Sequence, residues 1–215
     1  MPFGLLLYKS MTTLIAPFLG AFFRRRAKSG KEDAARIPER LAQQLPDRPG
    51  GTLIWLHAAS VGESQILLEL ARRIITRETG TASFLFTCQT QTGARLVQDA
   101  IASDEILSTR PCLQQMAPAD TPGIARRFLD HWQPAVAIFA EGEVWPNLTL
   151  ELDVRDVPTA LINARMTEKS IQGWLRWQKP AREELSSLDL MDAADTQPKT
   201  GLTELSTKTV ICPGN

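Results

Sequence analysis

Short apolar runs alternate along this chain with longer segments in which apolar residues recur every three or four positions. The clearest run covers residues 53–57 (LIWLH), and apolar positions return at helical spacing from Ser64 onward. A strand that ends in a turn of small residues and opens a helix is typical of a β-α-β unit. The same pattern predicts further strands at 82–87, 134–140, 158–162, 188–191 and 209–211, and a weaker one at 105–109. Helices are predicted at 64–78, from Gly93, from Asp120-Thr121-Pro122 to Trp132, after Pro146, and around Trp174 and Trp177.

The predicted strands are largely continuous in their apolar character, and helices are predicted between them. This combination indicates a mainly parallel sheet with helices on both faces. The expected fold class is therefore α/β, with a Rossmann-like sheet that begins at about Thr52.

The N-terminal segment has a different pattern. Residues 3–23 are apolar with two interruptions, Lys9 and Pro17, and five basic residues follow between 24 and 31 with no acidic residue directly among them. A spanning helix needs about 20 apolar residues, and a basic flank favours the anionic cytoplasmic side of a membrane. A cleavable signal peptide carries its charge before its apolar core, so we expect a retained anchor helix with the remainder in the cytoplasm.

Two alternatives for this segment stay open: a core helix packed on the domain, and a helix that lies in the membrane interface. The expected organisation is an anchor with its basic flank at 1–31, a linker with a short helix at 32–51, and the Rossmann-like domain at 52–215.

Composition narrows the chemistry. Lys and Arg together number 24, as do Asp and Glu, so net charge gives no reason to expect a nucleic-acid partner. Three widely spaced cysteines form no CxxC pair, and there are only two histidines, which argues against a metal site. No GxGxxG follows a predicted strand, which disfavours a nucleotide-dependent oxidoreductase. Acid–base chemistry, if present, falls to carboxylates.

Four predicted strand-to-helix loops carry the unusual polar residues. Such loops emerge at one edge of a parallel sheet, so we expect their side chains around one crevice. The candidates in these loops are Ser60, Gly62, Glu63, Thr90, Thr92, Gly93, Glu141, Glu143, Asn147 and Arg165.

Glu63 is the candidate catalytic base, because it follows the clearest strand at the start of a helix. The competing interpretation is structural: a first-turn Glu complements the helix dipole, and Ser60 to Glu63 has capping-box spacing. A base at that position needs an opposing influence such as burial. Thr90 and Thr92 could likewise be ordinary capping hydroxyls, and Gly93 either admits a ligand or opens a helix.

Glu141 and Glu143 are two residues apart, so in extended chain they point to one side and like charge raises the pKa of one of them. The alternative is that one caps the following helix while the other pairs with Arg165. His57 ends a predicted strand, and a satisfied, partly buried imidazole is the favoured interpretation.

Taken together these loops resemble a known family. The segments 36–41 (RIPERL), 55–63 (WLHAASVGE), 87–93 (TCQTQTG), 118–120 (PAD), 141–147 (EGEVWPN) and 163–165 (NAR) resemble, in order and spacing, the N-terminal half of the 3-deoxy-D-manno-octulosonic acid (Kdo) transferases.

The resemblance implies the N-terminal half of a GT-B glycosyltransferase, in which two Rossmann-like domains face each other across a cleft. It implies inverting transfer of Kdo from CMP-Kdo to the lipid A precursor at the cytoplasmic face of the bacterial inner membrane, among its lipids, with no metal or other cofactor. The N-terminal domain would receive the acceptor, and Glu63 corresponds to the family's general base.

Two departures from the family matter. Gly142 stands where the family usually has Thr between the two acidic residues, and the chain stops at Asn215, where the donor-binding domain would begin. We therefore expect the C-terminal domain to be absent and this chain alone to be inactive. The alternative function is a catalytically silent module that binds the lipid acceptor, or a truncated remnant.

Overall fold

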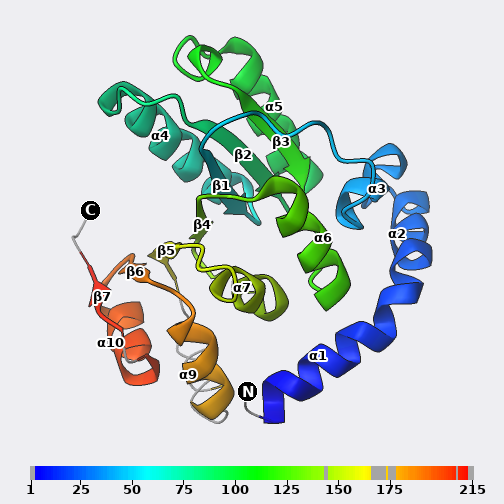
Figure 1. Ribbon diagram of the computed structural model, residues 1–215, viewed down its shortest axis with the longest axis vertical. Coiled ribbons are helices and arrows are strands. Elements are labelled where there is room, and N and C mark those ends of the chain that lie inside the picture. Colours follow the sequence, from blue (N-terminus) through cyan, green and yellow to red (C-terminus); the bar gives the residue numbers. More distant parts are fainter. Residues whose placement is uncertain (1–2, 143–144, 166–172, 174–177, 207, 213–215) are drawn as a thin grey trace.

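The computed structural model describes residues 3–142, 145–165, 173, 178–206 and 208–212. Among these residues the centre of the fold is one seven-stranded sheet of order β3-β2-β1-β4-β5-β6-β7 (Figure 1), and neighbouring strands in it are parallel. The strands are β1 Leu53–Ala58, β2 Ser83–Cys88, β3 Cys112–Met116, β4 Val136–Ala140, β5 Thr159–Ala164, β6 Leu190–Ala193 and β7 Val210–Ile211. This strand order is that of a Rossmann-like fold, so the predicted α/β class is confirmed.

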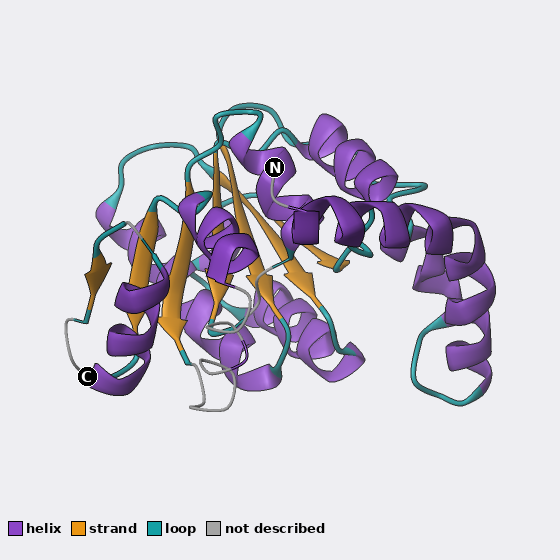
Figure 2. Ribbon diagram, turned by 90° about the horizontal axis from the view of Figure 1, so that it is seen from below, coloured by secondary structure: helices purple, strands orange, loops and turns teal. Residues whose placement is uncertain are grey.

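Helices cover both faces of the sheet (Figure 2). The helices are α4 Val61–Arg77, α5 Gln91–Ser103, α6 Pro122–Trp132, α7 Pro146–Asp153, α9 Gln178–Ser186 and α10 Thr196–Leu205. Successive residues of β1 point to opposite faces: Trp55 packs in the core beneath α6 and α7, whereas Leu56 packs against α4 and α5. Each fully buried large apolar side chain contributes about 1.5–3 kcal/mol, which explains why β1, buried at every position, can hold the sheet centre.

The strand predicted at 105–109 is wrong. That segment contains a 3₁₀ helix, η3 Leu107–Thr109, and the strand lies further on at Cys112–Met116. The Asp104 carboxylate accepts hydrogen bonds from the backbone N–H groups of Ile106 (2.9 Å) and Leu107 (3.0 Å), which winds the chain into a turn. The sequence of β3 contains two glutamines, which interrupt the apolar pattern typical of a buried strand. Gln115 is nevertheless buried, and its Oε1 accepts from Trp132 Nε1 at 2.9 Å.

The N-terminal segment forms two helices, α1 Phe3–Ile15 and α2 Leu19–Lys28, joined by the 3₁₀ helix η1 Ala16–Phe18 that contains Pro17. Figure 1 shows them in blue along the outside of the domain. Phe3–Lys28 is the described segment that is long and apolar enough to cross a membrane, by length and composition alone. The short helices η2 Ala34–Arg36 and α3 Ile37–Arg40 follow and lead back to the sheet.

Candidate functional site at the carboxyl edge

The candidate site lies where the loops after β1, β4 and β5 leave the sheet. Glu63 is the third residue of α4, and Ser60 is its N-cap residue, with Oγ accepting from the Glu63 backbone N–H at 3.2 Å. Glu63 Oε2 accepts from the backbone N–H of Ala59 at 2.7 Å. The capping-box interpretation therefore holds with one change, because the carboxylate reaches the residue before the N-cap.

Glu63 nevertheless has the setting that a base needs. It is 6% exposed, so its carboxylate is largely shielded from water. Within the part of the chain that the structure describes, no hydrogen bond reaches its second oxygen, Oε1. One oxygen thus orients the side chain while the other is available to a ligand.

Glu141 is the second carboxylate of the site. It follows β4, and its backbone N–H donates to Ile162 O at 2.9 Å. Burial raises the pKa of Glu141, the negative charge of Glu63 adds to that shift, and Arg165 opposes it. The charge of Glu63 acts on Glu141, and we call these two carboxylates the acidic pair; one comes from the first turn of α4 and the other from the loop after β4. Glu143 lies outside the described residues.

The backbone beside the acidic pair adopts an uncommon conformation at two residues. Glu141 and Asn163, at the ends of neighbouring strands, have φ of 59° and 50°. Non-glycine residues in the left-handed region carry strain of about 1 kcal/mol or more, and such residues cluster at ligand and active sites. Asn163 Nδ2 donates to Glu141 Oε1 at 3.4 Å, so the two strained positions support each other.

Arg165 contributes the positive charge of the site. Its Nε lies 3.4 Å from Glu141 Oε1, as in the alternative interpretation of the two glutamates, and its side chain is 65% exposed. The remaining guanidinium donors face solvent and suit a phosphate or carboxylate group.

The loop after β2 carries capping hydroxyls and a close contact. Thr90 is the N-cap residue of α5, and its Oγ1 accepts from Gly93 N–H at 3.2 Å and from Thr92 Oγ1 at 3.4 Å. A Cβ on Gly93 would lie 3.0 Å from Thr90 Oγ1 and 3.1 Å from Ser64 Oγ. Gly93 therefore lets the starts of α4 and α5 approach each other. Gly62 is exposed, and the nearest atom to a Cβ there would be Ser60 Oγ at 4.0 Å.

Asn147 is placed differently from the acidic pair. It is buried at the start of α7, and its Nδ2 donates to Asp120 O (3.0 Å), Asp120 Oδ2 (3.2 Å) and Thr12 Oγ1 (3.2 Å). The structure thus joins Asn147 to α1 and to the loop before α6. His57 is fully buried rather than partly buried, and its Nδ1 lies 2.8 Å from Thr87 Oγ1.

Two buried charged residues, Arg40 and Asp120, are absent from the candidates chosen by sequence. Both lie beside the loops of the carboxyl edge, and the contacts of each are given below. Their only sequence signal is that the segments 36–41 and 118–120 take part in the family resemblance.

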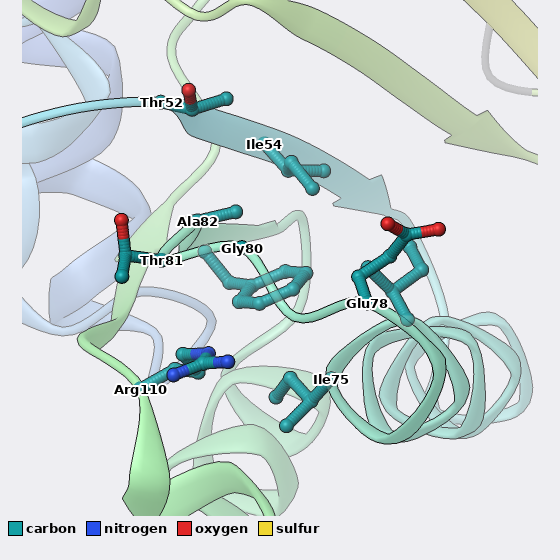
Figure 3. A pocket seen from close by; sticks show the side chains of 10 residues that line it. Thr52, Ile54, Ile75, Glu78, Gly80, Thr81, Ala82 and Arg110 are labelled. Atoms are coloured by element: carbon teal, nitrogen blue, oxygen red, sulfur yellow. The ribbon is translucent and has the colours of Figure 1, made fainter.

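A cavity of about 210 Å³ lies at the opposite, amino edge of the sheet. Ile54, Ile75 and Phe84 line it, with Glu78 and Arg110 at its sides (Figure 3). Parallel α/β sheets bind ligands at the carboxyl ends of their strands, and the acidic pair lies at that end. Among the described residues no group of three His, Cys, Asp or Glu side chains could hold a metal ion.

The fold is that of a Rossmann-like α/β domain, and its candidate site lies at the carboxyl edge of the sheet. The chain belongs to the 3-deoxy-D-manno-octulosonic-acid transferase (kdotransferase) family, because the sequence model of that family matches residues 35–215. The resemblance seen in the motifs is thereby confirmed, and it makes this domain part of a glycosyltransferase family.

Individual relatives agree with this assignment. The chain is 34% identical over 182 residues to the probable mitochondrial 3-deoxy-D-manno-octulosonic acid transferase of Arabidopsis thaliana, covering 85% of this chain and 38% of that protein. It is 33% identical to the transferase of Rickettsia bellii, covering 78% and 38%, and 28% identical to that of Haemophilus influenzae, covering 87% and 42%. The chain spans about two fifths of the length of these curated relatives.

Proposed function

We propose that this chain is the acceptor-binding part of a Kdo transferase of lipopolysaccharide biosynthesis and that Glu63 is its general base. The observation that carries the proposal is that the two carboxylate oxygens of Glu63 differ: Oε2 accepts from Ala59 N–H, and Oε1 has no hydrogen-bond partner among the described residues. The donor would be CMP-Kdo and the acceptor the lipid A precursor, as the resemblance implies.

In this mechanism Glu63 Oε1 removes the proton from the acceptor hydroxyl as that oxygen attacks the anomeric carbon of Kdo. CMP leaves from the opposite face, so the configuration at that carbon inverts. Arg165 holds a phosphate of the acceptor or the Kdo carboxylate through its exposed donors. The open surface at Gly62 lets a bulky acceptor come close to the first turn of α4.

The N-terminal helices would contact the cytoplasmic face of the inner membrane. The exposed apolar side chains are Phe3, Leu6, Leu7, Met11, Leu14, Ile15, Phe18 and Phe22. The basic end of α2, which includes Arg25, Arg26 and Lys28, suits anionic lipid headgroups. A membrane contact of this kind would keep the site near a lipid acceptor.

The test of the base is Glu63→Gln in an enzyme that joins this chain to a donor-binding domain. General-base catalysis contributes about 10²–10⁴-fold, so kcat should fall by that factor while acceptor binding is retained. The control is Glu69→Gln on the same helix, whose side chain is exposed and pairs with Arg73. Activity of the Glu63 variant within a few-fold of wild type would leave Glu63 a purely structural residue.

A second candidate is a catalytically silent module that binds the lipid acceptor. It draws on the same exposed guanidinium of Arg165 and the open surface at Gly62, and it needs no proton transfer at Glu63. Both functions predict that the purified chain binds lipid A precursor in detergent, so the transfer assay separates them. Only the enzyme predicts Kdo transfer once a donor-binding domain is supplied, and we expect none from the 215-residue chain by itself.

A further inference from the structure

Helix α1 is joined to the carboxyl edge by a buried carboxylate. Asp120, 7% exposed, accepts from Tyr8 Oη at 2.8 Å. Its two oxygens also accept from the backbone N–H groups of Asn147 (3.1 Å) and Leu148 (2.9 Å), the first turn of α7. The N-cap residue of α7 provides no side-chain cap of its own, so Asp120 caps this helix from a neighbouring loop.

The same network includes a second contact with α1. Asn147 Nδ2 donates to Thr12 Oγ1 at 3.2 Å, one helical turn beyond Tyr8. The loop that starts with Glu141 leads into α7. These contacts therefore link the position of α1 to the start of the helix that follows Glu141.

Helix α2 is joined to the other carboxylate, Glu63, through a second path, which touches the segment before Asp120 where Ala119 N–H donates to Arg40 O at 2.8 Å. Arg26 Nε lies 3.3 Å from Glu32 Oε1, and Glu32 Oε2 lies 3.1 Å from Arg40 Nη2. Arg40, 3% exposed, donates to Ala117 O (3.1 Å) and to the side chain of Gln89 (2.9 Å).

The path continues through the sheet edge. Gln89 N–H donates to Ala58 O at 3.0 Å, at the end of β1. The next residue, Ala59, is the one whose N–H binds Glu63. The two paths start at different helices: one ends at the first turn of α7, and the other ends at Ala59, whose N–H holds Glu63.

We propose that Asp120 and Arg40 are positioning residues that fix the α1–α2 pair on the carboxyl edge, so that the acidic pair sits at a set height above a bilayer. This inference rests on the membrane contact of the proposed function. It differs from a flexible tether, which would leave the site free to move relative to the lipid surface. Docking of α1–α2 on a bilayer then stabilises the hydrogen bonds at Asn147 and Leu148 by linkage.

The test is amide hydrogen exchange of the 215-residue chain, with and without vesicles of phosphatidylethanolamine and phosphatidylglycerol. Vesicles should slow exchange at Asn147 and Leu148 by about tenfold, the size of one hydrogen bond to a charged acceptor. In Tyr8→Phe and Thr12→Val the chain should still bind vesicles, but the slowing should fall below about twofold. A merely structural role for these contacts would change exchange equally with and without vesicles.

Thr13→Val is the matched control. Thr12 and Thr13 both bond to carbonyls of the preceding helical turn, but only Thr12 accepts from Asn147. Thr13→Val should respond to vesicles as the wild type does. Glu32→Gln tests the second path at the Gln89 amide, where the slowing by vesicles should also be lost.

The outcomes separate this inference from the proposed function. Vesicle binding that leaves exchange at Asn147 and Leu148 unchanged, or speeds it up, overturns the inference alone, because α1 would then act as a tether or leave the domain. A chain that binds no vesicles overturns the proposed membrane contact and the inference with it. Neither result bears on Glu63, which the transfer assay tests separately.

Discussion

Removing the guanidinium of Arg40 should be one of the most destabilising single changes in this chain. The side chains of Arg40 and Glu32 are 4% and 5% exposed and 3.1 Å apart. Burial lowers the pKa of Arg40, and the charge of Glu32 opposes that shift. Arg40→Met would leave the buried Glu32 carboxylate with only its 3.3 Å contact to the more exposed Arg26, and breaking a buried ion pair costs about 3–5 kcal/mol. That is a large part of the 5–15 kcal/mol typical of a whole domain.

The measurement is urea unfolding followed by far-UV circular dichroism and tryptophan fluorescence. Arg40→Met, Glu32→Gln and the double variant form a cycle in which the double variant should be about 1–3 kcal/mol more stable than the sum of the single effects predicts. Arg73→Met is the control, because its pair with Glu69 is exposed and its loss should leave the unfolding midpoint unchanged. A coupling energy near zero, or Arg40→Met within 1 kcal/mol of wild type, would refute the reasoning.

Three further predictions concern the site and its surroundings. Gly93→Ala should destabilise the fold by about 1–2 kcal/mol, since the new Cβ presses on two hydrogen-bonded hydroxyls; the matched Gly62→Ala should be neutral or stabilising in the same urea titration. Glu63→Gln should lower the pKa of Glu141 and Arg165→Gln should raise it, because these charges act on it in opposite directions; ¹³C NMR of the carboxylates would contradict this if neither variant moved it. Burial raises the pKa of Cys112 from 9.0 to about 11, so at pH 8 iodoacetamide should label it about 100-fold more slowly than a free thiol. Labelling at the free-thiol rate would contradict this. With a raised pKa the stability from the buried thiol is complete below pH 9 and is lost as pH rises toward 11.

The sheet could be predicted because most of its central strands coincide with continuous apolar runs in the sequence. β1, β2 and β4 are such runs, and they were found within one or two residues. β3 was missed because its burial depends on residues outside the strand: Gln115 Oε1 accepts from Trp132 Nε1 at 2.9 Å, and Glu39 Oε2 accepts from Met116 N–H at 2.6 Å on the outer edge. Periodicity cannot report such tertiary satisfaction of polar groups.

The candidate site was predictable as a set of loops but not as a set of contacts. Parallel topology places Glu63, Glu141 and Arg165 at one edge, and the structure brings them together. The same rule applied equally to Asn147, whose amide instead joins α1 to Asp120. Arg40 falls in the linker predicted at 32–51, because nothing local in the sequence RIPERL distinguishes a buried, paired arginine from a solvated one.

The two interpretations of Glu63, structural cap and base, do not exclude each other once its two oxygens are considered separately. Oε2 accepts from Ala59 N–H, which orients the carboxylate, and no described group bonds Oε1. A glutamine keeps a carbonyl oxygen for Ala59 and removes the negative charge and the capacity to take a proton, whereas alanine would also remove the cap and cost about 0.5–2 kcal/mol. Glu63→Gln therefore isolates the chemistry from the fold. A loss of turnover in that variant with an unchanged unfolding curve would assign the proton transfer to Oε1, whereas equal loss of both would return Glu63 to the structural role alone.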